Sequence, residues 1–231
     1  MPLKFYYWNA KGWAEPARQL LHYLKIDYEE TTWEDFPGWF AKRDEIFVDP
    51  IKSPFPDFPI LIDGDFVLSE QETIHYYLCK KFGRPDLYGK TLQDQVRVRQ
   101  INALLTKMLT KVIFQVVLSP DHKTNITEFL KEGGEINEYI KSLAGFLDDK
   151  NFLLGYLTIS DFRTAYQLRH VRNTALSNGL EDPIVGKHEN LVALIKRVAA
   201  LPELAGFAGG PKDYPFEPVA FAPWFKDHPL Q

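Results

Sequence analysis

The stretch PILIDGDFVL, residues 59–68, limits the choice of fold more than any other part of this chain. Two short apolar runs, 60–62 and 66–68, flank the pair Asp63-Gly64. That pair favours the tight type I′ turn of a β-hairpin. Helical patterns precede and follow the hairpin, so this part of the chain is predicted to fold as a mixed α/β layer.

The first 83 residues alternate between strand and helix patterns. LKFYYW at 3–8 has the aromatic content of a strand. Glu15-Pro16 opens an apolar helical pattern, because proline is favoured at a first helical position. Ser69 and Glu72 have the spacing of a capping box before another helix. The predicted order is a strand at 3–8, a helix from 15, a strand at 27–33, a short helix at 36–47, the hairpin, and a helix to about 82.

The remainder of the chain has the period of helices. Apolar residues recur at helical spacing from 98 to 112 and in several later segments. Thr158 and Asp161 form a second capping-box pattern. The last twenty or so residues are rich in proline and aromatic residues and are predicted to be packed coil. We therefore expect an α/β domain at 1–83, a linker at 84–93 and an all-α domain at 94–231.

Charge and composition exclude several classes of protein. A net charge of −4 with scattered Lys and Arg does not predict nucleic-acid binding. The single cysteine, Cys79, cannot form an intrachain disulfide. No signal-peptide pattern begins the chain, and no apolar run approaches the ~18 residues that span a bilayer. We expect a cytoplasmic protein without membrane attachment, and no metal site, because the six histidines lack ligand spacing.

Two adjacent tyrosines end the first predicted strand. Neighbours in a strand point to opposite faces, so Tyr6 and Tyr7 cannot share a role. Tyr7 shares a face with Leu3 and Phe5 and lies beside the NAKGW turn. From the strand alone it is either a buried tyrosine with a satisfied hydroxyl or a hydroxyl that a ligand reaches.

Two backbone features near the hairpin also have two interpretations. Pro59 is a strand-entry proline, or a cis proline that turns the Phe58 backbone outward to pair with an extended ligand. The helix after Ser69 has a free N-terminus that attracts carboxylates. Its own Glu70 and Glu72 also complement that dipole.

Three segments, in order, resemble cytosolic glutathione transferases of the mu and sigma classes. YYWNAKGWAEPARQLLHYL resembles the family's YxNxRGxAExxRxLLxY stretch. PFPDFPILIDGDFVLSEQETIHYYLCKKF resembles its loop, cis-proline, hairpin and third helix. FLLGYLTISDF resembles its G-x-x-LT-x-ADF segment. The resemblance implies a thioredoxin-like N-terminal domain followed by a helical domain, glutathione as co-substrate, and a homodimer.

The same resemblance assigns roles to particular residues. It implies that Tyr7 is the catalytic phenol and that Phe55 plugs into a partner subunit. The implied glutathione-binding residues are Trp8, Trp13, Trp39, Arg43, Asp57, Phe58, Glu70 and Gln71. The apolar lining expected for the second substrate is Val112, Val117, Phe216, Phe221 and Trp224, with ordinary core and tail packing as the alternative.

The chain departs from the family pattern at three places. The pair Glu70-Gln71 lacks the small hydroxyl that holds the γ-glutamyl carboxylate. Lys107 stands where mu enzymes supply an aspartate from the neighbouring subunit. A second tyrosine of mu enzymes is replaced near Val117. We expect a transferase that conjugates glutathione to small hydrophobic electrophiles. The alternatives are a ligandin- or crystallin-like carrier or structural protein, and a prostaglandin-type isomerase.

Overall fold

A computed structural model describes residues 2–34, 38, 57–217 and 221–230 of the chain. The chain divides into two compact units, Met1–Arg84 with Pro202–Ala220, and Pro85–Leu201 with Phe221–Gln231. The segment 202–220 was expected in the second domain, whereas its contacts group it with the first. The linker at 84–93 stays a prediction, and the short helix expected at 36–47 falls almost wholly outside the described residues.

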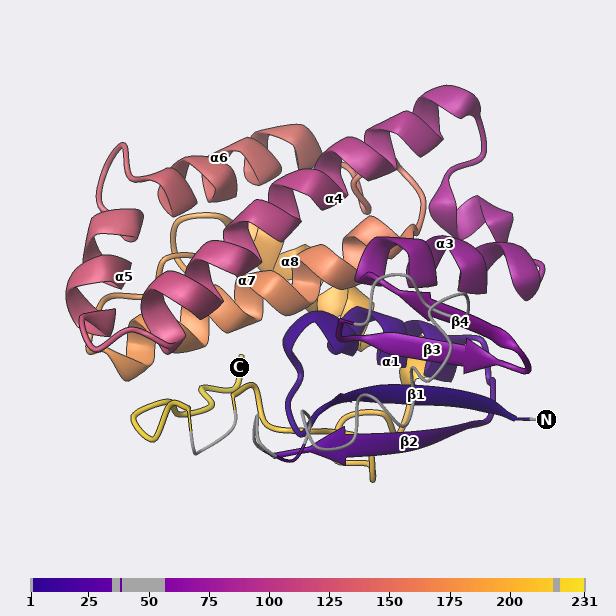
Figure 1. The fold of residues 1–231 in the computed structure, drawn as a ribbon. Coiled ribbons are helices and arrows are strands. Elements are labelled where there is room, and N and C mark those ends of the chain that lie inside the picture. Colours follow the sequence, from indigo (N-terminus) through magenta and orange to yellow (C-terminus); the bar gives the residue numbers. More distant parts are fainter. Residues whose placement is uncertain (1, 35–37, 39–56, 218–220, 231) are drawn as a thin grey trace. The chain divides into compact units, whose positions relative to one another are not determined.

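The first unit is built on a four-stranded sheet in the order β2-β1-β3-β4 (Figure 1). β1 (Leu3–Trp8) pairs in parallel with β2 (Tyr28–Trp33) and antiparallel with β3 (Ile60–Asp63). β3 continues antiparallel into β4 (Phe66–Ser69). This mixed sheet, with helices between its strands, confirms the α/β layer predicted from the hairpin.

The hairpin turn lies one residue later than predicted. Asp63 pairs with Phe66, so the two loop residues are Gly64 and Asp65 rather than Asp63 and Gly64. Of these two only Gly64 has positive φ, at 61°. A two-residue loop with positive φ at its first position alone is a type II′ turn, which glycine favours there. The predicted type I′ turn is therefore wrong, although the hairpin is right.

Alternation along β1 separates its two faces. Leu3, Phe5 and Tyr7 are 5%, 0% and 2% exposed. Lys4 is exposed and Tyr6 is half-buried. α1 (Glu15–Tyr23) begins where predicted, with proline in its first turn, and it packs against α3 (Gln71–Lys81). Residues 15 to 21 of α1 are all buried, so this helix is enclosed along most of its length.

The described part of the second unit is helical, which confirms the all-α expectation. Its longest helices, α4 (Leu92–Val112) and α7 (Ile159–Ser177), pack against each other. A π-helical stretch, Ile113–Val117, continues α4. The other helices are α5 (His122–Leu130), α6 (Glu135–Leu147) and α8 (Glu189–Ala199), and short 3-10 turns occur at Pro85–Tyr88 here and at Gly12–Ala14 and Pro202–Leu204 in the first unit.

The N-terminus of α7 confirms the second predicted capping box. The Asp161 carboxylate accepts hydrogen bonds from the Thr158 N–H (2.7 Å) and the Thr158 hydroxyl (2.9 Å). It also accepts one from the Leu153 N–H at 2.8 Å. Asp161 is completely buried, so this carboxylate ties the preceding loop to the helix inside the core.

Candidate functional site

The candidate site begins with Tyr7 near the end of β1. Its ring lies 5.9 Å from the Phe58 ring and 5.5 Å from the Arg18 guanidinium. Only 2% of the residue is exposed, as in the first of its two interpretations, a buried tyrosine. The phenol is thus enclosed by the groups around it.

The turn after β1 is shaped around the Tyr7 hydroxyl. The Trp13 N–H donates a hydrogen bond to the Tyr7 Oη at 2.8 Å. Gly12 has φ +41°, and a Cβ placed on it would lie 2.2 Å from the same oxygen. No atom larger than hydrogen fits there, so glycine is required at this position. This glycine lies within the first of the three motifs, but no role for it was predicted from the sequence.

Burial dominates the acid–base behaviour of this phenol. Loss of solvation raises the pKa of Tyr7 well above its ordinary value of 10. The Trp13 N–H and the Arg18 guanidinium oppose that rise, whereas the Glu217 and Asp57 carboxylates add to it. The phenol consequently keeps its proton throughout the physiological pH range.

Arg18 is the buried cation behind the turn, and no role for it was predicted from the sequence. It is 0% exposed. Its Nε donates to Glu30 Oε1 at 2.7 Å, and its two terminal nitrogens donate to the carbonyl oxygens of Ala10 (2.6 Å) and Trp8 (3.3 Å). The sequence did carry a sign of this role, because Arg18 lies among the apolar positions of the α1 helical pattern. An arginine at such a position is rarely buried without dedicated partners.

Tyr6 faces the other side of the sheet, as its neighbour relation to Tyr7 predicts. Its ring lies 5.7 Å from the Trp33 ring. Both belong to an apolar cluster around Ile60 and Val67 that also includes Trp8, Phe58 and Ile62. Tyr6 is therefore a packing residue, with a role different from that of Tyr7.

The Phe58–Pro59 peptide bond is cis, as in the second of the two interpretations of Pro59. The Phe58 N–H, however, donates to Asp57 Oδ1 at 2.8 Å. A ligand that pairs with this N–H must replace the Asp57 carboxylate. The Trp8 ring meets the Phe58 ring edge-on, with centroids 4.9 Å apart.

The capping box predicted at Ser69 is wrong. Ser69 is the last residue of β4, and the N-cap of α3 is Glu70, without a side-chain capping bond. Glu70 has φ 69° and ψ 118°. Positive φ at a residue other than glycine is strained, and such strain clusters at ligand-binding positions. Gln71 begins the helix and is 6% exposed.

The remaining predicted residues divide among several places. Trp39, Arg43 and Phe55 lie outside the described residues. Trp13 is half-buried and Lys107 is exposed. In the second unit, Val112 and Val117 are 0% and 2% exposed, which fits the core-packing alternative. Phe221 and Trp224 there are half-buried, and Trp224 stacks on His122 with centroids 4.2 Å apart. Phe216 is a buried residue of the first unit.

Two properties of the described residues bear on other kinds of site. None of their helices combines the length and the apolar character needed to cross a bilayer. They also contain no cluster of three or more His, Cys, Asp or Glu side chains placed to hold a metal ion.

Comparison with curated proteins finds similar sequences. The chain is 32% identical to "Glutathione S-transferase Mu 1" of Oryctolagus cuniculus over 176 residues, covering 70% of this chain and 72% of that protein. It is 30% identical to "Glutathione S-transferase Y1" of Cricetulus longicaudatus, covering 73% and 78%. A mite protein, "Glutathione S-transferase" of Tyrophagus putrescentiae, is 26% identical with 86% of both chains covered. No protein-family model matches the chain.

Solved structures show the same fold at lower identity. "Rat hPGDS complexed with a quinoline" aligns with a TM-score of 0.76 at 23% identity, covering 91% of this chain and 98% of that one. "NaGST-2" aligns with a TM-score of 0.74 at 21% identity, covering 91% and 97%. The fold class is thus a thioredoxin-like domain followed by a helical domain, as the motifs implied.

Proposed function

Because this chain belongs to the glutathione S-transferase family, we propose that it conjugates the glutathione thiol to small hydrophobic electrophiles, with Tyr7 as the hydrogen-bond donor to sulfur. Members of this family transfer glutathione, so the chain is an enzyme of the transferase class. One observation carries the role of Tyr7. Its hydroxyl accepts the Trp13 N–H at 2.8 Å and donates to no described residue. The hydroxyl proton is therefore available to a sulfur anion.

The thiolate is the species that attacks carbon. A cysteine-like thiol of pKa about 8.5 is only about 3% ionised at pH 7. A hydrogen bond to sulfur stabilises the anion and lowers the thiol pKa. Since burial keeps Tyr7 protonated, the phenol can act as this donor and not as a base.

Ionisation alone gives a small gain. Lowering the thiol pKa by roughly two units raises the thiolate fraction about 25-fold at pH 7. The weaker nucleophilicity of the less basic thiolate removes roughly eightfold at a Brønsted slope near 0.45. The net gain of about threefold means that most acceleration must come from holding the electrophile beside the sulfur. We propose that the electrophile is held by apolar residues of the second unit, Val112, Val117, Phe221 and Trp224, and a contact with Phe216 of the first unit stays a prediction.

Glutathione itself would bind along the first unit. The α3 N-terminus supplies the positive end of a helix dipole for the γ-glutamyl carboxylate. The strained backbone at Glu70 and the buried Gln71 begin that helix. We propose that the other contacts come from Trp8, Trp13, Trp39, Arg43, Asp57 and Phe58.

The role of Tyr7 is tested by Tyr7→Phe, with Tyr6→Phe as the matched control. Both variants remove one phenolic oxygen from the same strand, but from opposite faces. We expect Tyr7→Phe to lower kcat/KM for conjugation of an activated aryl halide at least ~10-fold, the scale of a general acid–base group. The thiol of bound glutathione should titrate at a higher pH. Tyr6→Phe should retain wild-type kinetics.

Equal rates for wild type and Tyr7→Phe would remove this phenol from the mechanism. A carrier function is the second candidate, and the 2% exposure of Tyr7 favours it. Retention on immobilised glutathione without turnover in the wild type would support that candidate. The isomerase alternative also stays a prediction, since the likeness to rat hPGDS shows the fold alone.

We also propose a homodimer that covers the start of α4. Leu92 is 72% exposed and Val96 58% exposed, and four residues apart they share one helical face. We expect Leu92→Glu to shift the protein from dimer to monomer in sedimentation velocity. Val185→Glu, at another exposed apolar residue (41%), should remain dimeric. A Leu92→Glu dimer of wild-type affinity would place the interface elsewhere.

The location in the cell also stays a proposal. The sequence led us to expect a cytoplasmic protein that binds no nucleic acid. Fractionation of cells that express the tagged chain would check the location.

A further inference from the structure

A short segment near the carboxyl end, residues 211–217, lies across the turn that follows β1. We call this segment the carboxyl strap. The Lys11 N–H donates to the Pro215 carbonyl oxygen at 2.8 Å. The Lys11 ammonium contacts the Asp213 carboxylate and the Tyr214 carbonyl oxygen. The strap and the turn are thus joined through both the backbone and the side chain of one residue.

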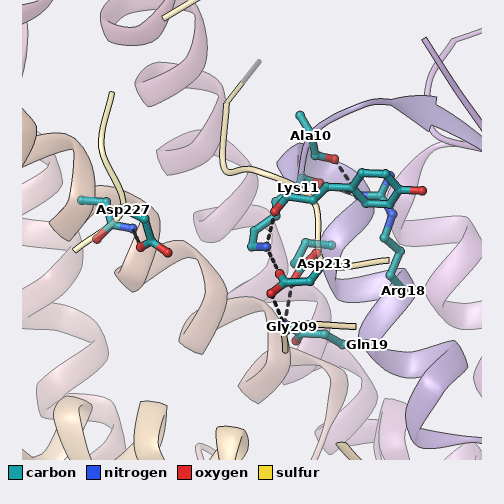
Figure 2. Close-up of polar contacts among 10 residues, drawn as sticks. Ala10, Lys11, Arg18, Gln19, Gly209, Asp213 and Asp227 are labelled. Atoms are coloured by element: carbon teal, nitrogen blue, oxygen red, sulfur yellow. Dashed lines mark hydrogen bonds and ion pairs between the residues drawn. The ribbon is translucent and has the colours of Figure 1, made fainter. Parts of the chain in front are cut away.

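The Lys11–Asp213 ion pair is enclosed and fixed from both sides. The Lys11 side chain is 6% exposed and that of Asp213 is 28% exposed. The Gly209 N–H donates to the other Asp213 oxygen at 2.7 Å. Figure 2 shows the Lys11 side chain directed at Asp213, with Gly209 next to the same carboxylate. Removing one partner of such a pair leaves an uncompensated charge with little access to water, unlike the loss of a surface pair.

Arg18 forms a second connection between strap and turn. Its guanidinium lies 4.1 Å from the centroid of the Tyr214 ring. The same guanidinium donates to the carbonyl oxygens of Ala10 and Trp8, on either side of Asn9 in the turn. An arginine over an aromatic ring is an attractive contact that strengthens when it is desolvated.

The turn held by these contacts is the one that surrounds the Tyr7 hydroxyl. Lys11 directly precedes Gly12, and the Trp13 N–H that bonds Tyr7 Oη is two residues further on. The Lys11 carbonyl oxygen also accepts hydrogen bonds from the N–H groups of Ala14 (3.1 Å) and Glu15 (2.9 Å). A displacement of Lys11 would therefore move the Trp13 N–H relative to the phenol.

We propose that the carboxyl strap positions the Tyr7 hydroxyl through the Lys11–Asp213 ion pair, which makes Lys11 and Asp213 positioning residues for the transfer reaction. This inference rests on the proposed role of Tyr7. The connection to the phenol runs through the Trp13 N–H, which bonds Tyr7 Oη and lies two residues after Lys11. Lys11 and Asp213 both act through the turn, whose geometry sets where the hydroxyl proton points.

The test uses Asp213→Asn in the full-length chain, with Asp227→Asn as the matched control. Asp227 belongs to the same carboxyl region, and its carboxylate accepts a hydrogen bond from Asn173 in the second unit. Lys11→Gln and the double variant complete a mutant cycle, which shows whether the two residues act as one unit. The charged groups with the largest effect on the Tyr7 pKa are Arg18 of α1, Glu217 of the strap and Asp57 before β3, and none of them is changed.

Two readouts are needed. The first is hydrogen exchange of the Trp13 amide, which does not depend on activity. The second is the pH profile of kcat/KM for the electrophile at saturating glutathione, which reports the pKa of the enzyme-bound glutathione thiol. We expect Asp213→Asn to speed the exchange of the Trp13 amide. It should also raise the apparent pKa of the bound thiol by roughly half to one unit, toward that of free glutathione, which lowers kcat/KM about three- to tenfold at low pH. Lys11→Gln should do the same, and the double variant should add little. Asp227→Asn should match wild type.

Unchanged exchange and an unchanged profile in Asp213→Asn and Lys11→Gln would overturn the proposal. Faster exchange with an unchanged profile would also overturn it, because the strap would then stabilise the turn without positioning the phenol. Failure of the proposed function is read from Tyr7→Phe instead. If that variant loses activity while both strap variants match wild type, the role of Tyr7 stands and the strap proposal falls.

Discussion

Gly12→Ala is expected to lower kcat/KM at least ~10-fold and to lower the free energy of unfolding by about 2–5 kcal/mol, the sum of overpacking and a positive-φ alanine. The added Cβ would lie 2.2 Å from Tyr7 Oη and 2.9 Å from the ring atom Cε1. Neither the strand that carries Tyr7 nor the turn that carries residue 12 can withdraw freely, because both are hydrogen-bonded. The phenol must therefore shift away from the Trp13 N–H. Steady-state kinetics and urea unfolding measure the two effects.

Gly83→Ala is the matched control for this variant. Gly83 also has positive φ, at +71°, but a Cβ there meets no atom within 4 Å. Gly83→Ala should show only the backbone cost, about 1 kcal/mol, and wild-type kinetics. If Gly12→Ala behaves like Gly83→Ala, the space beside the hydroxyl is not needed, and the account of this turn is wrong.

Asp161→Ala is expected to lower the free energy of unfolding by about 3–5 kcal/mol, because two buried N–H groups and a hydroxyl lose their acceptor together. The three donors belong to Leu153 and Thr158. Asp161 is 0% exposed, so water cannot replace the carboxylate. Urea unfolding at pH 7 would measure the loss. A loss below ~1 kcal/mol would mean that the loop rearranges to satisfy these groups.

The pH dependence of this effect has a definite sign. Burial raises the pKa of Asp161 to about 6, from an ordinary value of 3.8, against the opposing effect of its hydrogen bonds. Between these two pH values the folded chain holds a proton that the unfolded chain has released, so stability falls as pH rises. The stabilisation from the Asp161 proton, roughly 3 kcal/mol, is fully present below pH ~4 and is lost as the pH rises through ~6. The stability difference between wild type and Asp161→Asn should therefore shrink from pH 5 to pH 7.5.

The capping box of α4 provides the contrasting case. Asp94 accepts a hydrogen bond from the Thr91 N–H at 3.2 Å and one from the Tyr156 hydroxyl at 2.9 Å. The Tyr156 hydroxyl in particular lowers the pKa of Asp94 below its ordinary value. The contribution of Asp94 to the free energy of unfolding is therefore present at neutral pH and is lost in acid, whereas that of Asp161 is present in acid and is lost as the pH rises. A difference between wild type and Asp94→Asn that grows in acid would contradict this assignment.

Much of the first unit could be predicted from local patterns. The strand at 3–8, the helix from Glu15 and the hairpin all depend on residues close in sequence, and all were found. The turn of the hairpin was displaced by one residue, because Asp-Gly and Gly-Asp both fit between the same apolar runs. The pairing register of β3 with β4 determines which two residues form the loop, and this register cannot be read from the local sequence.

The two predicted capping boxes show the limit of spacing as evidence. Thr158 and Asp161 form their box, whereas Ser69 and Glu72 have a similar spacing and do not. Pairing with Ile60 extends β4 through Ser69, and the helix begins two residues later. A sheet contact outweighed the local preference of serine for the cap.

The surroundings of Tyr7 were predicted less completely than its position. The side of the sheet followed from alternation, and the motif resemblance implied a role for this phenol. The contacts of Arg18 with Tyr214 and of Lys11 with Asp213 join residues about 200 positions apart, a separation at which periodicity and turn chemistry carry no information. The predicted residues Trp39, Arg43 and Phe55 stay predictions.

Lys11 and Asp213 are separated by 202 positions. Translation proceeds from the N-terminus, and domains fold as they emerge from the ribosome. The sequences of all the strands and helices in the described parts of the chain are therefore synthesised before the partner of Lys11. A product truncated just before Asp213 would keep these elements but leave the Lys11 ammonium without its carboxylate, so the turn around the Tyr7 hydroxyl acquires this ion pair only after residue 213 has been made.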